Sequence, residues 1–141
     1  MTTSNESRDV TQLTSREKAL IAAKAAAEKK AGELVVLEVA ELIGITDYFV
    51  ICSGSNERQV ATIIDEVTKE LKGHGVKPYR IEGHRDRRWA LIDYLDLVVH
   101  VFHEEERDFY GLERLWQDAP RLVLEEDSEH GDLEAKASGG D

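Results

Sequence analysis

The chain has 141 residues and a net charge of −11 at pH 7, and it is 41% hydrophobic and 33% charged. That length suits one domain with one core, and no apolar run approaches the roughly 18 residues that a membrane helix needs. The first residues show no basic stretch followed by an apolar one, so we expect no secretory signal and a cytoplasmic protein. The single cysteine, Cys52, excludes an intramolecular disulfide and a multi-cysteine zinc site.

The charge is unevenly distributed along the chain. Residues 125–141 carry seven acidic residues against one lysine, Lys136, so more than half of the net charge lies there. An acidic body disfavours broad nucleic-acid binding, which depends on neutralising phosphates, and favours a basic partner through long-range attraction.

The composition predicts a folded domain between two tails. Residues 1–12 are polar without periodicity, and the acidic stretch 125–141 has little to bury, so both are predicted to be flexible or disordered. One folded domain is therefore expected at 13–124.

The first predicted elements are a helix and two strands. Thr14 and Glu17 have the spacing of a capping box, and the alanine-rich stretch after them favours a helix that stops at Gly32. Strands are predicted at 34–39 and 48–53. The second is almost wholly apolar, which is typical of a central strand covered on both faces.

The later elements continue this alternation. An amphipathic helix is predicted at 57–72, a short strand at 79–82, a hairpin at 87–102 and a last helix from His103 onward. The order αββαβββα predicts an α/β fold with a mixed sheet flanked by helices. The strand–helix–strand step over 48–82 suits a parallel, right-handed crossover.

The hairpin contains the residues that suggest a function. With Tyr94 and Leu95 as a two-residue turn, Trp89 would pair with His100, and alternation would separate an apolar face from a mixed one. Leu95 is a poor residue for such a turn, because its positions usually need positive φ. The mixed face would hold Trp89, Leu91, Asp93, Asp96, Val98, His100 and Phe102.

This mixed face has three interpretations. Its aromatic residues could be a second core beneath a helix. Asp93 and Asp96, opposite one another at about 5 Å, could share a cation in a metal-dependent catalytic site. Trp89 within a polar rim could instead be the anchor of a protein-docking face, and we favour this interpretation over a catalytic site.

Other motifs give weaker indications. The SGSN stretch before the helix at 57–72 could cradle a phosphate or simply cap that helix. The five histidines show no metal-binding spacing. The basic turn at 85–88, which includes Arg85 and Arg87, could be a solvated turn or a minor contact to RNA phosphates.

Three motifs together resemble the ribosomal silencing factor family, also called Iojap-like. They are ITDYFVICSGSNERQV, the G-x-x-x-x-x-W-x-L-x-D pattern in GHRDRRWALID, and DLVVHVFHEEERDFYGLERLW. The resemblance runs from about residue 16 to 120. Many members carry glycine where this chain has Leu95.

The resemblance implies a translational repressor and not an enzyme. Members bind the large ribosomal subunit through its ribosomal protein number fourteen and block joining of the small subunit sterically, which reduces translation when nutrients are short. It also implies a nucleotidyltransferase-like fold, a homodimer when free, and no cofactor or metal. The expected partner-binding residues are Trp89, Leu91, Asp93, His100 and Tyr110, and the alternative is a metal-dependent nucleotidyltransferase using Asp93 and Asp96.

Overall fold

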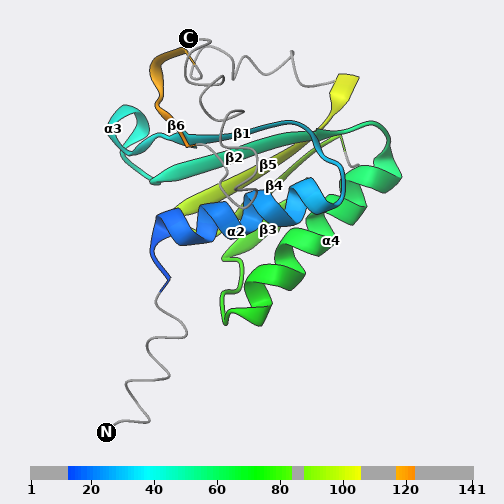
Figure 1. Ribbon diagram of the computed structural model, residues 1–141, viewed down its shortest axis with the longest axis horizontal. Helices are drawn as coiled ribbons and strands as arrows, with labels where there is room; N and C mark the ends of the chain where they lie inside the picture. The colour runs from blue at the N-terminus through cyan, green and yellow to red at the C-terminus, as the bar shows by residue number, and fades with distance from the viewer. Residues whose placement is uncertain (1–12, 84–87, 106–116, 123–141) are drawn as a thin grey trace, which may run out of the picture.

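The computed structural model describes residues 13–83, 88–105 and 117–122 (Figure 1). Within these residues the chain forms three helices and six strands. In chain order they are α2 (Ser15–Glu28), β1 (Gly32–Glu38), α3 (Ala40–Ile43), β2 (Tyr48–Gly54), α4 (Glu57–Gly73), β3 (Arg80–Glu82), β4 (Trp89–Asp93), β5 (Leu97–His103) and β6 (Arg121–Leu122).

The six strands form one mixed sheet in the order β3-β4-β5-β2-β1-β6. β2 and β5 are parallel neighbours at its centre, and every other neighbouring pair is antiparallel. It follows that β2 and β3 run in the same direction, as the predicted crossover requires, although β5 and β4 lie between them. The mixed α/β architecture predicted from the sequence is therefore confirmed.

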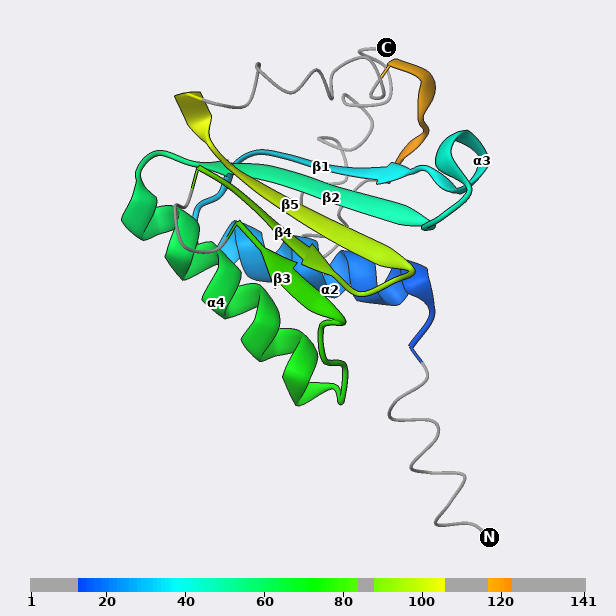
Figure 2. The same cartoon turned by 180° about the vertical axis from the view of Figure 1, so that it is seen from behind.

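Helices α2 and α4 lie side by side across one face of the sheet, and Figure 2 shows the other face in front of them. The predicted capping box is present: the Thr14 hydroxyl accepts from the Glu17 amide, and the Glu17 carboxylate accepts from the Thr14 amide. Alanines of α2 allow close approach, and α4 supplies larger apolar side chains. This helix-covered face holds the larger core cluster.

The second face of the sheet carries a smaller apolar cluster. Leu37, Ile51 and Phe102 are fully buried there, and Phe49 and Trp89 pack at its margin half-buried. Alternation along each strand separates the two clusters, because successive side chains point to opposite faces. β2 contributes to both, as expected for a central strand.

Several boundaries differ from the sequence-based prediction. Helix α2 ends at Glu28, and Lys30, at φ 63°, makes the turn that was expected at Gly32, which instead begins β1. The short helix α3 and strand β6 were not predicted. The predicted last helix falls largely on 106–116, outside the described residues. Among the helices described, none has the length and apolar character needed to cross a membrane.

The hairpin register was predicted wrongly, by two residues. Trp89 pairs with Phe102 and Leu91 pairs with His100, whereas Trp89 had been expected opposite His100. A shift of two preserves the alternation, so the two faces contain the predicted residues. The physical reason for the shift is that the turn lies one residue later than expected: the Tyr94 amide donates to the Leu97 carbonyl and closes the hairpin around Leu95 and Asp96.

Candidate functional site

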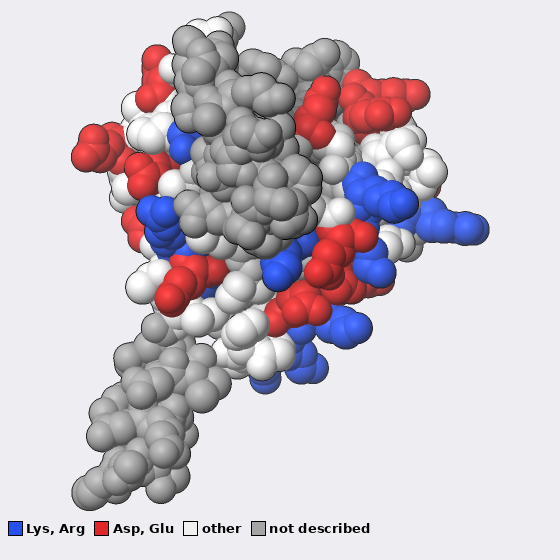
Figure 3. All heavy atoms as spheres, viewed as in Figure 1, with Lys and Arg blue, Asp and Glu red and all other residues white. Residues whose placement is uncertain are grey.

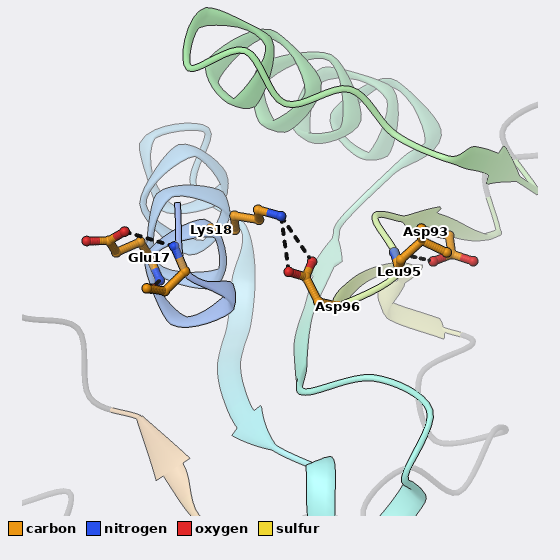
Figure 4. A network of polar contacts seen from close by, with 6 residues as sticks. Glu17, Lys18, Asp93, Leu95 and Asp96 are labelled. Carbon is orange, nitrogen blue, oxygen red and sulfur yellow. Dashed lines mark hydrogen bonds and ion pairs between the residues drawn. The ribbon is translucent and has the colours of Figure 1, made fainter. Parts of the chain in front are cut away.

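The turn between β4 and β5 consists of Tyr94, Leu95 and Asp96. Leu95 has φ 76°, in the left-handed region that disfavours side chains. The Asp93 carboxylate holds this conformation by accepting from the Leu95 amide at 2.8 Å (Figure 4). The Asp96 amide donates to the Tyr94 carbonyl at 2.9 Å. Asp93 therefore precedes the turn and Asp96 lies within it, so the two aspartates are not cross-strand partners.

The carboxylates of Asp93 and Asp96 are directed to different partners. The Lys18 ammonium on α2 donates to Asp96 at 3.0 Å, and the Arg80 guanidinium on β3 donates to Asp93 at 3.3 Å (Figure 4 shows the first contact). The expected geometry, in which they would share a cation, is wrong. In the described part of the chain, no group of three or more His, Cys, Asp or Glu residues is arranged to hold a metal ion.

The SGSN stretch caps α4. The Asn56 side chain accepts from the Gln59 amide at 2.8 Å, while the Gln59 side-chain oxygen accepts from the Ser55 amide and hydroxyl. The Gln59 side-chain nitrogen then donates to the carbonyls of Lys29 and Lys30 at the end of α2. Because side chains occupy the Ser55 and Gln59 amides, this structure supports the capping interpretation over the phosphate cradle.

Trp89 lies within a group of aromatic rings on the second face. Its ring stacks on Phe102 with centroids 5.3 Å apart and on His100 at 6.1 Å, and Phe49 meets His100 edge-on at 4.5 Å. The indole nitrogen donates to His100 Nδ1 at 3.3 Å. The half-buried Trp89 ring is thus held by stacking and by a directional bond.

His100 is buried within this group, with 5% of its surface exposed. Burial lowers the pKa of His100 to about 4, so its ring is neutral at pH 7. Its second nitrogen, Nε2, is buried and has no hydrogen-bond partner among the residues described. The residue predicted to contact a partner is therefore a buried neighbour of Trp89.

Leu91 and Asp93 continue this face along β4 as half-buried residues. Arg80, whose side chain is about half exposed, lies beside Asp93 on β3 and adds a charged rim that sequence reasoning missed. The structure therefore brings together Trp89, Leu91, Asp93 and His100. Tyr110, Arg85 and Arg87 lie outside the described residues.

The charges of the described surface are mixed. Acidic and basic side chains are intermingled over the coloured part of the face seen in Figure 3, and Arg88 pairs with Glu105 at 3.4 Å. An acidic hollow with a volume of about 600 Å³ lies at the Tyr48 end of β2. Trp89 lies at the opposite end of the strands, so the hollow and the aromatic group are separate features. The hollow is lined by Ser15, Glu38, Ala40, Glu41, Leu42, Asp47, Tyr48, Asp118 and Pro120.

A mixed sheet with a half-buried tryptophan in a polar rim, and with its aspartates engaged in ion pairs, defines an interaction protein more readily than a catalyst. Residues 12–140 match the family model described as "Ribosomal silencing factor during starvation". The chain belongs to that family, whose described role, ribosomal silencing, is regulatory.

Individual relatives agree with this membership. A ribosomal silencing factor from Halalkalibacterium halodurans is 42% identical over 113 residues, which cover 80% of this chain and 97% of that protein. A crystal structure of a Bacillus halodurans protein is similar with a TM-score of 0.68 and 40% identity, covering 77% of this chain and 99% of that one. "Mitochondrial assembly of ribosomal large subunit protein 1" from Mus musculus is 33% identical over 92 residues, covering 63% of this chain and 40% of that protein.

Proposed function

We propose that this protein binds the large ribosomal subunit through its ribosomal protein number fourteen and sterically blocks joining of the small subunit. Translation is thereby reduced when nutrients are short, in the cytoplasm and without a cofactor. Two findings support the proposal: the family description names silencing during starvation, and the mouse relative is named for assembly of the large subunit. The observation that carries the choice of surface is the half-buried Trp89 on the second face of the sheet.

We call the surface formed by Trp89, Leu91 and Asp93 the docking face. A large aromatic side chain that is already ordered loses little conformational entropy on binding, which favours its use as an anchor. Stacking on Phe102 and His100 orders Trp89 in this way. Leu91 extends the apolar area beside it, and Tyr110 is proposed as a further neighbour.

The rim of the docking face suits a basic partner. Asp93 already interacts with Arg80 at 3.3 Å, and its side chain is 15% exposed. A lysine or arginine from a ribosomal protein could add a second positive group to this carboxylate, and the net charge of −11 would attract it from a distance. A minor contact to ribosomal RNA through Arg85 and Arg87 is a further, weaker part of the proposal.

The competing nucleotidyltransferase proposal loses its central geometry. It needs Asp93 and Asp96 around one cation, yet each carboxylate has its own cationic partner on a different element. Its phosphate cradle would also have to displace the Gln59 side chain from the Ser55 amide. Steric blocking of subunit joining requires no reaction at the two aspartates and no phosphate bound at the SGSN stretch.

A homodimer of the free protein is also proposed. Strand β3 is at the edge of the described sheet, with Tyr79 68% and Ile81 39% exposed, and such an edge can pair with another strand. Antiparallel pairing about Ile81 would place Arg80 opposite the partner's Glu82. Light scattering of Ile81→Lys, with Ile45→Lys as an exposed control elsewhere, tests this: only the first should be monomeric, and a dimer in both would contradict this interface.

The binding partner is tested by photo-crosslinking on purified large subunits. A photoreactive amino acid at Arg80, on the rim of the docking face, should attach the protein to ribosomal protein fourteen. The same group at the exposed Lys69 on α4, on the helix-covered side, should not. Attachment from Lys69 alone, or from Arg80 to a different ribosomal protein, would overturn the proposal.

A further inference from the structure

The hydrogen bond between Trp89 and His100 determines which imidazole nitrogen carries the proton. An indole N–H can only donate, so His100 Nδ1, which lies 3.3 Å from it, must accept. The proton of the neutral ring is then on Nε2, and the lowered pKa of His100 agrees with a neutral ring.

This arrangement leaves a buried polar group unsatisfied. Nε2 carries the proton and has no hydrogen-bond partner in the described parts of the chain, although the whole residue is only 5% exposed. Burying a donor without an acceptor opposes folding. A phenylalanine at this position would avoid that cost and could still meet Phe49 edge-on and stack on Trp89, so folding alone does not explain a histidine here.

The acceptor on His100 does something that stacking cannot. Stacking of Trp89 on Phe102 and His100 fixes the plane of the indole but tolerates sliding and a flip of the ring within that plane. A hydrogen bond from the indole nitrogen is directional and selects one of these placements. The edge of Trp89 that remains exposed is thereby determined.

We propose that His100 is a positioning residue for docking, whose Nδ1 holds the Trp89 indole in the orientation that the partner recognises. The proposal rests on the proposed function of the docking face. It corrects the expectation that His100 itself touches the partner, because a buried ring acts through Trp89.

Two substitutions separate positioning from packing. His100→Phe keeps an aromatic ring and removes the unpaired Nε2 donor, but it also removes the acceptor of the half-buried Trp89 indole N–H, so the two effects oppose one another and the melting temperature should change little. Its affinity for large subunits should nevertheless fall by about five- to ten-fold, the usual value of one hydrogen bond. His100→Asn places an amide oxygen near the Nδ1 position in a smaller side chain, so it should lower the melting temperature and keep affinity within about two-fold of wild type.

Affinity and stability should therefore rank these two variants in opposite orders. If affinity instead follows stability, with His100→Phe binding as wild type does, His100 is a packing residue and the proposal is wrong. In the Trp89→Ala background, His100→Phe should cause no further loss of affinity, because its effect passes through the indole. If the affinity losses of the two single variants instead add in the double variant, His100 does not act through Trp89 and the proposal is wrong.

A spectroscopic readout tests the geometry without any ribosome. Long-range ¹H–¹⁵N spectra of the full chain should show His100 protonated on Nε2 and not on Nδ1. The Trp89 indole proton should exchange with solvent faster in His100→Phe than in wild type or His100→Asn. A proton on Nδ1 would overturn the proposal, whereas failure of wild type to bind large subunits in spite of the expected spectra would refute only the proposed function.

Discussion

The Lys18 ammonium lies 3.0 Å from the Asp96 carboxylate and ties the first turn of α2 to the turn between β4 and β5. Both side chains are partly exposed, at 16% and 35%, so solvent screens the pair. The contact occupies one of the two aspartates that a metal-dependent activity would need. The contact gives Asp96 a structural role in the turn between β4 and β5.

Removing this ion pair should cost little stability and no binding. We expect Lys18→Met to lower the free energy of unfolding by about 0.5–1 kcal/mol, because a screened pair contributes little. Asp96→Asn should have a similar effect, and both variants should bind large subunits as wild type does. Urea unfolding and co-sedimentation measure the two quantities; loss of binding in Asp96→Asn with a stable fold would restore a functional role for that carboxylate.

The buried His100 should make stability depend on pH. Its pKa is about 4 in the folded protein and about 6.5 in an unfolded chain, so below pH 6.5 the unfolded state takes up a proton that the folded state refuses. Stability should therefore fall as pH drops from about 6.5 to about 4, by roughly 3 kcal/mol from this group, and level off below. Above pH 6.5 this contribution is constant.

His100→Phe is the control for that dependence. It removes the titrating group and keeps an aromatic ring, so the difference in unfolding free energy between wild type and variant should grow in favour of the variant as pH falls. A difference that stays constant between pH 7 and pH 4.5 would show that the imidazole takes up its proton as readily in the folded state as in the unfolded chain.

Gly54, at the end of β2, is required by close packing against α4. A Cβ added there would lie 2.8 Å from Val60 Cγ2 and 2.9 Å from the Val60 backbone nitrogen, which is closer than these atoms can approach. We expect Gly54→Ala to lower the free energy of unfolding by about 1–3 kcal/mol. Gly73→Ala, where nothing lies within 4 Å, should be neutral or up to about 1 kcal/mol stabilising; equal losses in urea unfolding would contradict this distinction.

Leu95 stores backbone strain in the turn. At φ 76° with a side chain that is 58% exposed, it gains little from burial and occupies a conformation that glycine adopts freely. We expect Leu95→Gly to raise the free energy of unfolding by about 1 kcal/mol. Leu95→Ala keeps the Cβ, so its free energy of unfolding should not rise. A rise in Leu95→Ala without a rise in Leu95→Gly would show that the leucine side chain, and not the backbone, is the source of the destabilisation.

The faces of the hairpin were predictable from sequence, and its register was not. Alternation assigned Ala90 and Val99 to the core beneath the helices and Trp89 to the second face, because a two-residue error leaves parity intact. The register depends on a turn in which Leu95 takes a positive φ, which is exceptional for leucine. The capping box at Thr14 was predictable because it is local.

The contacts that define the site depend on tertiary structure. Arg80 reaches Asp93 only because β3 pairs with β4, and the Lys18–Asp96 pair joins residues 78 positions apart. No periodicity in the chain indicates that Trp89 donates to His100, since the two residues are diagonal and not opposite in the sheet. Sequence reasoning placed Trp89, Leu91 and Asp93 on one face of the hairpin, whereas the contacts that their side chains make required the structure.

The most direct test of the central claim is subunit joining in the presence of Trp89→Ala. Purified large subunits are incubated with wild type, with Trp89→Ala or with Ile45→Ala, and small subunits are then added before sedimentation. Ile45 is an apolar control that is 82% exposed and lies at the opposite end of the strands from Trp89. We expect wild type and Ile45→Ala to bind and suppress joined ribosomes, while a folded Trp89→Ala loses at least about 2 kcal/mol of binding, roughly 30-fold in affinity, and permits joining. A folded Trp89→Ala that still suppresses joining as wild type does would contradict the assignment of the docking face.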